Sequence, residues 1–214
     1  MVYLLGLSVG YCLGCINPAY SMARLKGFDI REYGSKNAGA SNVLITMGMV
    51  GGCICAVLDV AKAALAVWLM KWLFPDVDTF AITATACILG HIFPFYLGFR
   101  GGKGLACLGG AILAFSLRVF VILLILELLI ALLTKYICYV PITASILFTF
   151  LYAYTTGDLW GSALWGVVAI VILYKHLVNL QRIMQGRELR LSYLWARDRE
   201  TMRVKGRDSG SNDT

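Results

Sequence analysis

The sequence predicts an all-α integral membrane protein, a bundle of seven transmembrane helices with its N-terminus outside and its C-terminus in the cytoplasm. First, 59% of the 214 residues are apolar and only 14% are charged, whereas a soluble domain is about half apolar and about a quarter charged. Second, long apolar runs alternate with short clusters of Lys and Arg. Third, most basic residues fall on one of the two sides that the runs define.

Each predicted span is an apolar run bounded by polar residues. The fourth and fifth runs are separated by Arg118, with no Gly or Pro between them. Joined, residues 105–133 would form a helix of roughly 43 Å, against a hydrocarbon core of about 30 Å. Split, each run is short for a full span, so the distribution of charge has to decide. The seven predicted spans are Val2–Ala23, Thr46–Leu73, Thr79–Leu97, Leu105–Leu117, Val119–Leu133, Tyr136–Thr155 and Trp160–Tyr174.

The basic residues favour the split. With seven spans, 16 of the 19 Lys and Arg residues lie on one side, which the positive-inside rule places in the cytoplasm. Joining the fourth and fifth runs would send nine basic residues of the C-terminal segment to the outside. We therefore predict a membrane domain over residues 1–188 and a basic, mobile cytoplasmic tail over residues 189–214, whose Lys and Arg can hold anionic lipid headgroups.

Other segment types are not expected. Met1–Ser21 lacks the charged start of a signal peptide. The seven cysteines lie in or beside apolar runs, where they pack between helices, and no disulfide framework is implied.

A basic glycine-rich segment, FRGGKG at Phe99–Gly104, lies between two apolar runs. Glycine lets the backbone approach a ligand closely, and successive exposed N–H groups form an anion-binding nest. With Lys103 and Arg100 the segment predicts a phosphate or carboxylate cradle at a membrane surface. The alternative is a basic loop that only fixes topology. It is not a Walker A loop, because Gly104 follows Lys103 where Ser or Thr would hold Mg²⁺.

Two further polar segments share the predicted cytoplasmic face. Residues 34–42, read GSKNAGASN, place hydroxyl, amide and glycine groups at the start of a helix, where an anion is stabilised. The alternative there is a flexible surface loop with an N-cap. Residues 176–188, read HLVNLQRIMQGRE, put His176 and Asn179 on one helix face, with Arg182 and Glu188 following. A histidine and an amide at the mouth of a polar pocket can position a hydroxyl acceptor.

Ionisable residues also occur within the apolar runs. Asp59 and Lys62 share a helix face, which favours a structural ion pair over direct substrate contact. His91 precedes Pro94, which frees backbone carbonyls, so a structural and a functional role are both open. Glu127 has no obvious partner. No metal site is expected. The HxxxxD pair common in glycerolipid acyltransferases is absent, because Tyr96 and Gln181 stand at that offset.

The three segments together closely resemble the motifs of the bacterial acyl-phosphate:glycerol-3-phosphate acyltransferase family of integral membrane enzymes. Members carry GS-x-N-x-GA-[TS]-N, then H-x-FP-x-x-x-x-F-[KR]-GGKG, then H-x-x-N-[IL]-x-R-[LI]-x-x-G-x-E. The chain matches these patterns at residues 34–42, 91–104 and 176–188, here called the first, second and third motifs. Asp59 and Lys62 also fit the family. Its fold is a seven-span bundle with a cytoplasmic active site, in agreement with the topology predicted from the charges.

The resemblance implies transfer of an acyl group from acyl phosphate to the 1-hydroxyl of glycerol 3-phosphate, giving lysophosphatidic acid in the bacterial cytoplasmic (inner) membrane. No cofactor and no nucleic-acid partner are expected, and the partners are the two substrates and the bilayer. Substrate phosphate would assist deprotonation, and His176 as general base is the rival scheme. The implied catalytic residues are Ser35, Lys103, His176 and Asn179, and the implied substrate-binding residues are Gly34, Lys36, Asn37, Ser41, Asn42, His91, Arg100, Gly101, Gly102, Gly104, Arg182 and Glu188.

The chain departs from the family pattern at two places. Ile45 stands where members usually have an arginine that helps to bind substrate phosphate, and Lys36 stands where glycine is usual. Either Lys36 supplies the lost charge, or substrate use has drifted or activity has weakened. A polar residue expected in the sixth span is replaced near Pro141, with Thr143 or Ser145 as candidates to stand in.

Two other functions stay open at the level of sequence. One is a transporter or channel for phosphorylated metabolites, against which the clustering of polar motifs at one face argues. The other is an inactive paralogue that binds lipid precursors. The oligomeric state and the preferred chain length of the acyl group are open as well.

Overall fold

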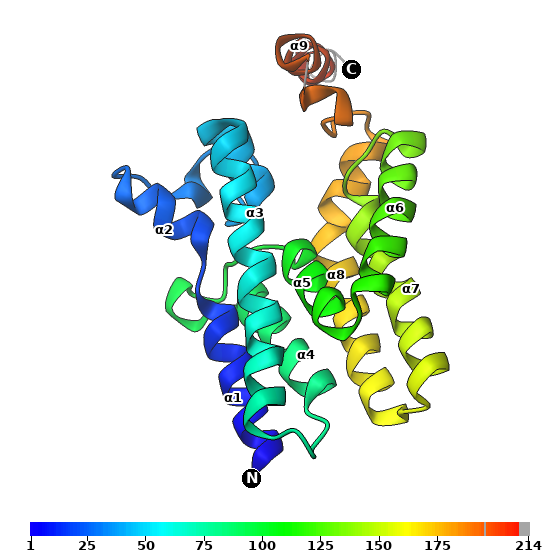
Figure 1. Ribbon diagram of the computed structural model, residues 1–214. Coiled ribbons are helices and arrows are strands. Elements are labelled where there is room, and N and C mark those ends of the chain that lie inside the picture. Colours follow the sequence, from blue (N-terminus) through cyan, green and yellow to red (C-terminus); the bar gives the residue numbers. More distant parts are fainter. Residues whose placement is uncertain (195, 210–214) are drawn as a thin grey trace.

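The computed structural model describes residues 1–194 and 196–209, and within these ranges every regular element is helical (Figure 1). The all-α prediction is confirmed over this part of the chain. The α-helices are α1 (Val2–Cys15), α2 (Pro18–Leu25), α3 (Ala40–Leu73), α4 (Phe80–Ile92), α5 (Leu105–Phe115), α6 (Leu117–Thr134), α7 (Tyr139–Thr156), α8 (Leu159–Met184) and α9 (Arg197–Ser209). The 3-10 turns are η1 (Ile30–Glu32), η2 (Phe95–Leu97) and η3 (Leu191–Leu194).

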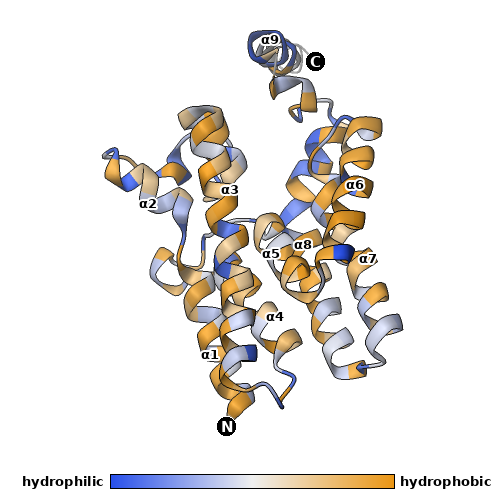
Figure 2. Ribbon diagram, in the orientation of Figure 1, coloured by the Kyte–Doolittle hydropathy of each residue, from blue (hydrophilic) through white to orange (hydrophobic). Residues whose placement is uncertain are grey.

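Five described helical segments are long and apolar enough to cross a membrane. Figure 2 shows apolar residues along most of the bundle, whereas α9 is strongly hydrophilic. α5 is apolar but only 11 residues long. The chain is thus a multi-pass helical membrane protein, and the number of seven spans remains a prediction. The five segments are Val2–Leu25, Ala40–Leu73, Phe80–Leu97, Leu117–Thr134 and Leu159–Met184.

The predicted runs differ from the observed helices in their boundaries. The run Val2–Ala23 is not one helix, because the Asn17 side chain accepts the N–H of Tyr20 and Pro18 takes the first position of α2. The helix of the third run ends at Ile92, before Pro94. The predicted separation of residues 105–117 from 119–133 is present as a break at Ser116, whose extended backbone ends α5 and whose hydroxyl caps α6. The helix of the last run continues to Met184.

The helices form two groups that meet along α3, α4, α5 and α8. α1 lies against α4 and α3, and α7 lies between α6 and α8. The groups are joined where α3 contacts α5 and where α4 contacts α8 (Figure 1). An aromatic cluster fills the core near this junction, with Phe148, Tyr152 and Trp165 fully buried against Phe80 and Phe115.

The described part of the tail folds beside the end of α8. The Leu191 N–H donates to the Lys135 carbonyl at 2.7 Å, which attaches η3 to the α6–α7 connection. α9 then lies at the end of the molecule that holds the first turns of α3 and the end of α8 (Figure 1). The domain boundary after residue 188 and the mobility of the tail stay predictions, and residues 210–214 lie outside the described ranges.

Candidate functional site

The first motif is shaped by the side chain of Asn42, which is fully buried. Its Nδ2 donates to the carbonyls of Ile30 and Tyr33 at 2.8 and 2.9 Å, and its Oδ1 accepts the Ser35 N–H at 2.8 Å. Gly34 has φ +57°, and a Cβ there would lie 2.2 Å from Asn42 Oδ1. Asn42 and Gly34 therefore set the path of the loop, and their predicted role in substrate binding stays a prediction. The sequence alone does not distinguish an amide that is buried in this way from one that contacts a ligand.

The other residues of the first motif lie nearer to the surface. Ser35 and Asn37 are half-buried, while Lys36 and Ser41 are exposed. Lys36 adopts φ +58°, a left-handed conformation that is uncommon outside glycine. These four side chains remain the substrate-facing candidates of this loop.

The glycine-rich end of the second motif packs against His91, the residue at which the motif begins. The N–H groups of Gly101 and Gly102 donate to the carbonyls of Ile92 and His91 at 3.1 and 3.0 Å. A Cβ on Gly102 would lie only 2.0 Å from His91 Nε2. This differs from the expected anion nest, because both N–H groups already have acceptors within the chain. The two glycines let the loop lie on the histidine ring, and the side chains of the motif remain the candidates for anion binding.

Lys103 and Arg100 supply the charge of the second motif. Arg100 is exposed, whereas Lys103 is half-buried. Burial lowers the pKa of Lys103, the nearby positive charge of Arg182 lowers it further, and the carboxylate of Glu188 opposes the shift. Gly104, with φ +93°, directly follows the lysine and is the N-cap residue of α5. A partly desolvated ammonium group is thus presented at a helix N-terminus, where an anion is favoured.

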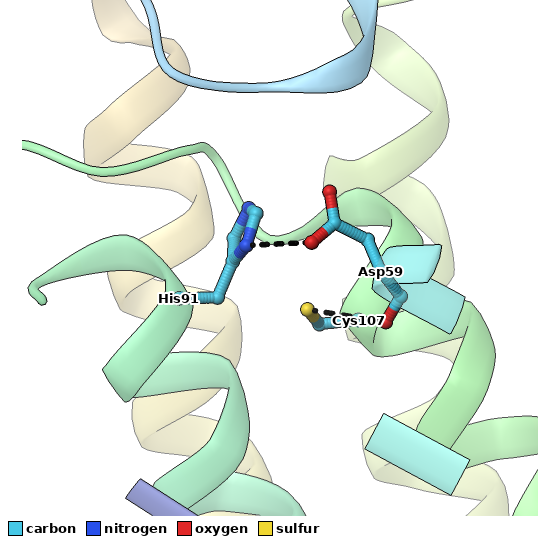
Figure 3. A group of neighbouring side chains, drawn as sticks. All are labelled: Asp59, His91 and Cys107. Carbon is cyan, nitrogen blue, oxygen red and sulfur yellow. Dashed lines mark hydrogen bonds and ion pairs between the residues drawn. The ribbon is translucent and has the colours of Figure 1, made fainter. Parts of the chain in front are cut away.

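A buried ionic cluster lies behind this loop. Asp59 Oδ1 is 2.8 Å from Lys62 Nζ and 3.2 Å from His91 Nδ1, and all three side chains are at least 90% buried. Figure 3 shows His91 and Asp59 pointing toward one another. Lys62 also donates to the carbonyls of Gly14 and Ile16, where α1 ends. The predicted Asp59–Lys62 ion pair is therefore present, and His91 joins it behind the loop, while a substrate-binding role of His91 stays a prediction.

The same cluster has ligand types that metals use. Single ligand atoms of Asp59, His91 and Cys107 lie within 4.8 Å of one another (Figure 3). However, Lys62 Nζ lies 2.8 Å from Asp59 Oδ1 and 3.0 Å from His91 Nδ1, so an ammonium ion already occupies the position between these two groups. A second cation there would be repelled. The residues present fit an ion-pair cluster better than a metal centre.

The third motif meets the second motif through an amide. Lys103 Nζ donates to Asn179 Oδ1, and Asn179 Nδ2 donates to Glu188 Oε1 at 2.8 Å. His176 is buried, and its Nδ1 lies 2.8 Å from the Ile172 carbonyl. That contact favours the tautomer with hydrogen on Nδ1, which leaves Nε2 as a proton acceptor. Arg182 is exposed, and its carbonyl accepts the N–H groups of Arg187 and Glu188, which curls the chain back toward Asn179.

The structure brings parts of all three motifs together. Lys103 and Asn179 join the second motif to the third. A Cβ on Gly39 would lie 3.8 Å from the Gly102 Cα, which puts the end of the first motif beside the second. The arrangement can neutralise a phosphate with lysine and arginine beside hydroxyl, amide and imidazole groups.

Arg31 is a contributor that the sequence interpretation missed. Its guanidinium donates to the Leu97 carbonyl at 2.7 Å and also pairs with Asp29. The hydrogen bonds between Arg31 and Asp29 lower the pKa of the Asp29 carboxyl. Arg31 thereby ties the segment before the first motif to the second motif. The only available signal was an isolated Asp-x-Arg spacing in a polar loop, which is common in surface loops.

Glu127 has a partner in the structure. Its Oε2 accepts the Thr143 hydroxyl at 2.6 Å, which connects α6 to α7. The hydroxyl of Thr143, a candidate to stand in for a polar site residue, is therefore hydrogen-bonded to Glu127. The hydroxyl of Ser145, the other candidate, donates to the Ile142 carbonyl. The Glu127–Thr143 contact could not be found from sequence, because it joins two helices whose contacting faces were unknown, whereas the Ser145 bond is local to α7.

A cavity of about 410 Å³ lies between the α1–α2 break and η2, and it touches the motifs only through Phe95 and Tyr96 of the second. It is lined mainly by apolar groups. Because no residue of the first or third motif and no basic residue lines it, its size does not make it the phosphate site. Its lining residues are Cys12, Cys15, Ile16, Asn17, Ser21, Phe95 and Tyr96.

Comparison with known proteins gives a consistent result. A family model described as glycerol-3-phosphate acyltransferase matches residues 4–186. A glycerol-3-phosphate acyltransferase of Legionella pneumophila is 36% identical over 193 residues, covering 90% of this chain and 70% of that protein. The corresponding protein of Bordetella avium is 34% identical over 192 residues, covering 86% of this chain and 90% of the relative.

Solved structures agree with the sequence comparisons. The crystal structure of PlsY (YgiH), an integral membrane glycerol 3-phosphate acyltransferase, in its glycerol 3-phosphate form, superposes with a TM-score of 0.80 at 33% identity, covering 91% of this chain and 98% of that one. The lysophosphatidic acid form of the same protein gives a TM-score of 0.77 at 32% identity, covering 89% of this chain and 95% of that one.

Proposed function

The chain belongs to the glycerol-3-phosphate acyltransferase family of integral membrane proteins, and we propose that it transfers a fatty acyl group from an acyl phosphate to the 1-hydroxyl of sn-glycerol 3-phosphate. The product is lysophosphatidic acid, and the related PlsY has structures of a glycerol 3-phosphate form and of a lysophosphatidic acid form. The observation that carries the proposal is the contact between Lys103 and Asn179, because it joins a phosphate-binding group to the hydroxyl-positioning motif.

The proposed reaction is a direct acyl transfer. The 1-hydroxyl oxygen forms a bond with the carbonyl carbon, the bond between that carbon and the phosphate oxygen breaks, and phosphate leaves with the hydroxyl proton. Lys103 and Arg100 stabilise phosphate charge, and Ser35 donates to it. Asn179 holds Lys103 in place, and His176 orients the acceptor while the hydroxyl donates its hydrogen to the departing phosphate. His176 as the general base is the second scheme.

An assay of the purified protein tests the donor and the acceptor together. Protein in detergent receives palmitoyl phosphate and glycerol 3-phosphate, and released phosphate and lysophosphatidate are measured. We expect one phosphate for each lysophosphatidate formed. Formation of product from palmitoyl-CoA but not from palmitoyl phosphate would contradict the proposal that acyl phosphate is the donor. If neither donor acylates glycerol 3-phosphate or other phosphorylated acceptors, the enzyme proposal fails, and the transporter or lipid-binding alternative takes its place.

Lys36 is proposed to replace the charge that the family arginine at position 45 would supply. Lys36 is exposed on the first motif, whereas Asn42 of the same motif is buried. We expect Lys36→Ala to abolish turnover, because an ammonium group that neutralises substrate phosphate is lost. The matched control is Lys26→Ala, which removes an exposed lysine of the same connection. Near-normal rates for Lys36→Ala would refute this role and leave drift in substrate use as the explanation of Ile45.

The membrane topology is proposed as seven spans, with the N-terminus outside and the active site facing the cytoplasm of the bacterial inner membrane. Support comes from the break at Ser116 and from the start of α1 and α9, which lie at opposite ends of the molecule (Figure 1). α5 is only about 16 Å long at 1.5 Å per residue. The second-motif loop would complete that crossing by entering the bundle from the cytoplasmic side.

Reporters at the two ends of the chain test this topology. We expect green fluorescent protein at the C-terminus to fluoresce in cells, because it folds in the cytoplasm. An epitope at the N-terminus should be accessible to antibody in intact spheroplasts. A protected N-terminal epitope together with a fluorescent C-terminus would indicate an even number of spans.

A further inference from the structure

The helix α9 lies beyond the segment that the family model matches. That match ends at residue 186, whereas α9 runs over Arg197–Ser209. It lies at the end of the molecule where α8 finishes (Figure 1). Nothing in the three motifs predicts a role for it, yet two of its arginines make hydrogen bonds to backbone near the site.

Arg203 holds the turn that ends the third motif. Its Nη1 donates to the Gly186 carbonyl at 2.7 Å and its Nη2 donates to the Glu188 carbonyl at 2.6 Å. Its Nε donates to Glu200 Oε2 at 2.9 Å, and the other oxygen of this buried carboxylate accepts the Ser192 hydroxyl at 2.8 Å. The planar guanidinium is thus fixed on one side by Glu200 and binds two carbonyls with the other side.

The same turn carries the side chain that reaches the proposed active site. Glu188 Oε1 accepts from Asn179 Nδ2, and Asn179 Oδ1 accepts from Lys103 Nζ. We propose that Arg203 is a positioning residue for acyl transfer, which fixes the Gly186–Glu188 turn so that Glu188 and Asn179 hold Lys103 at the substrate phosphate. This inference rests on the proposed function.

A second arginine attaches α9 to the other group of helices. Arg197 Nη2 donates to the Ile45 carbonyl at 3.0 Å, in the helical turn that follows the first motif. Its guanidinium also lies over the Tyr193 ring, 5.7 Å from the centroid. α9 therefore links the helix of the first motif to the turn of the third. Arg203 acts on the site more directly than Arg197, because one of its carbonyl partners belongs to Glu188 itself.

Kinetics of full-length variants test the positioning role. We expect Arg203→Ala to lower kcat/KM about tenfold, because the turn loses both guanidinium bonds. Arg203→Lys should recover only part of this loss, since an ammonium group cannot bind both carbonyls in the plane of a guanidinium. The matched control is Arg199→Ala, on the exposed side of the same helix, which should change kcat/KM by less than twofold. Equal rates for Arg203→Ala and Arg199→Ala would overturn the proposal.

A double-mutant cycle separates positioning from general loss of structure. Glu188→Ala cuts the link between the turn and Asn179, so Arg203→Ala should have little further effect on kcat/KM in that background. A full tenfold additional loss in the double variant would show that Arg203 acts by another route and would contradict the proposed relay. Arg199→Ala combined with Glu188→Ala should be additive.

Limited trypsin digestion supplies a readout that needs no catalysis. The bonds after Arg187 and Arg190 lie in and beside the turn that Arg203 holds, so Arg203→Ala should speed cleavage there and Arg199→Ala should not. If the native protein proves inactive in the acylation assay, the proposed function fails whatever the digestion shows. If the native protein is active and Arg203→Ala neither slows catalysis nor speeds cleavage, only the positioning role fails.

Discussion

Replacement of Lys103 by alanine is expected to lower kcat/KM by about 100- to 1000-fold, the range found when one preorganised donor to a developing charge is removed. Lys103 is the charged group of the second motif that also contacts the third, through Asn179. Loss of Lys103 removes the positive charge that would neutralise the substrate phosphate, and it leaves Asn179 Oδ1 without its donor. The measurement is the rate of phosphate release with each substrate varied in turn, which also shows whether the KM for acyl phosphate or for glycerol 3-phosphate rises.

The same lysine should give the reaction a pH dependence. Burial lowers the pKa of Lys103 below the usual value of a lysine. Because the ammonium form binds phosphate, kcat/KM should fall as the pH rises through this lowered pKa. Lys103→Arg keeps its charge at every accessible pH, so that variant should lose the alkaline decline even if its rate is lower. An unchanged alkaline limb in Lys103→Arg would assign the decline to another group.

A loss of more than tenfold is needed to support a direct role for Lys103. The control is again Lys26→Ala, which removes one positive charge from the same predicted face without touching the three motifs. If Lys103→Ala and Lys26→Ala slow the reaction to the same small extent, Lys103 contributes only to the general potential of the surface.

Replacement of Asp59 by alanine is expected to destabilise the fold by about 3–5 kcal/mol, the cost of removing one partner from a buried ion pair. Lys62 and His91 both lie within 3.2 Å of Asp59 Oδ1 and are buried. Without the carboxylate, the Lys62 ammonium remains in an apolar interior with no counter-ion. The melting temperature in detergent should fall by roughly 10 °C or more for a chain of this size.

Asp59→Asn distinguishes charge from shape. The amide is nearly the same size but carries no charge, so its melting temperature should fall almost as far as that of Asp59→Ala. Asp76→Ala, an exposed carboxylate in the α3–α4 connection, is the matched control and should leave the melting temperature within about 1 °C. Native melting temperatures for both Asp59 variants would show that the ion pair is not needed for stability.

The sequence predicted those features that depend on pattern along the chain. The apolar runs located the helices, and the spacing of Asp59 and Lys62 predicted their ion pair because a helix fixes which residues share a face. The order of the three polar motifs predicted the Lys103–Asn179 neighbourhood at the level of segments. The individual contact was not predictable, since it joins residues 76 positions apart.

The remaining features depend on where each helix ends and on which of its faces contacts its neighbours. The amides of Gly101 and Gly102 were expected to face a ligand, but they donate to carbonyls at the end of α4 because that helix stops at Ile92. The partner of Glu127 depends on which face of α7 meets α6. Likewise, a basic and polar C-terminal segment gives no sign that one of its arginines binds two carbonyls of the third motif.

The contacts of Lys62 have a consequence for how the chain is assembled in the bilayer. The carbonyls of Gly14 and Ile16, where α1 ends, receive the Lys62 ammonium from 48 and 46 residues further along the chain. Unpaired carbonyls are costly in hydrocarbon. During synthesis α1 leaves the ribosome well before this donor exists, so Lys62 satisfies these two carbonyls only once α3 is beside α1. We therefore expect the end of α1 to be stabilised in the bilayer by segments that are synthesised after it.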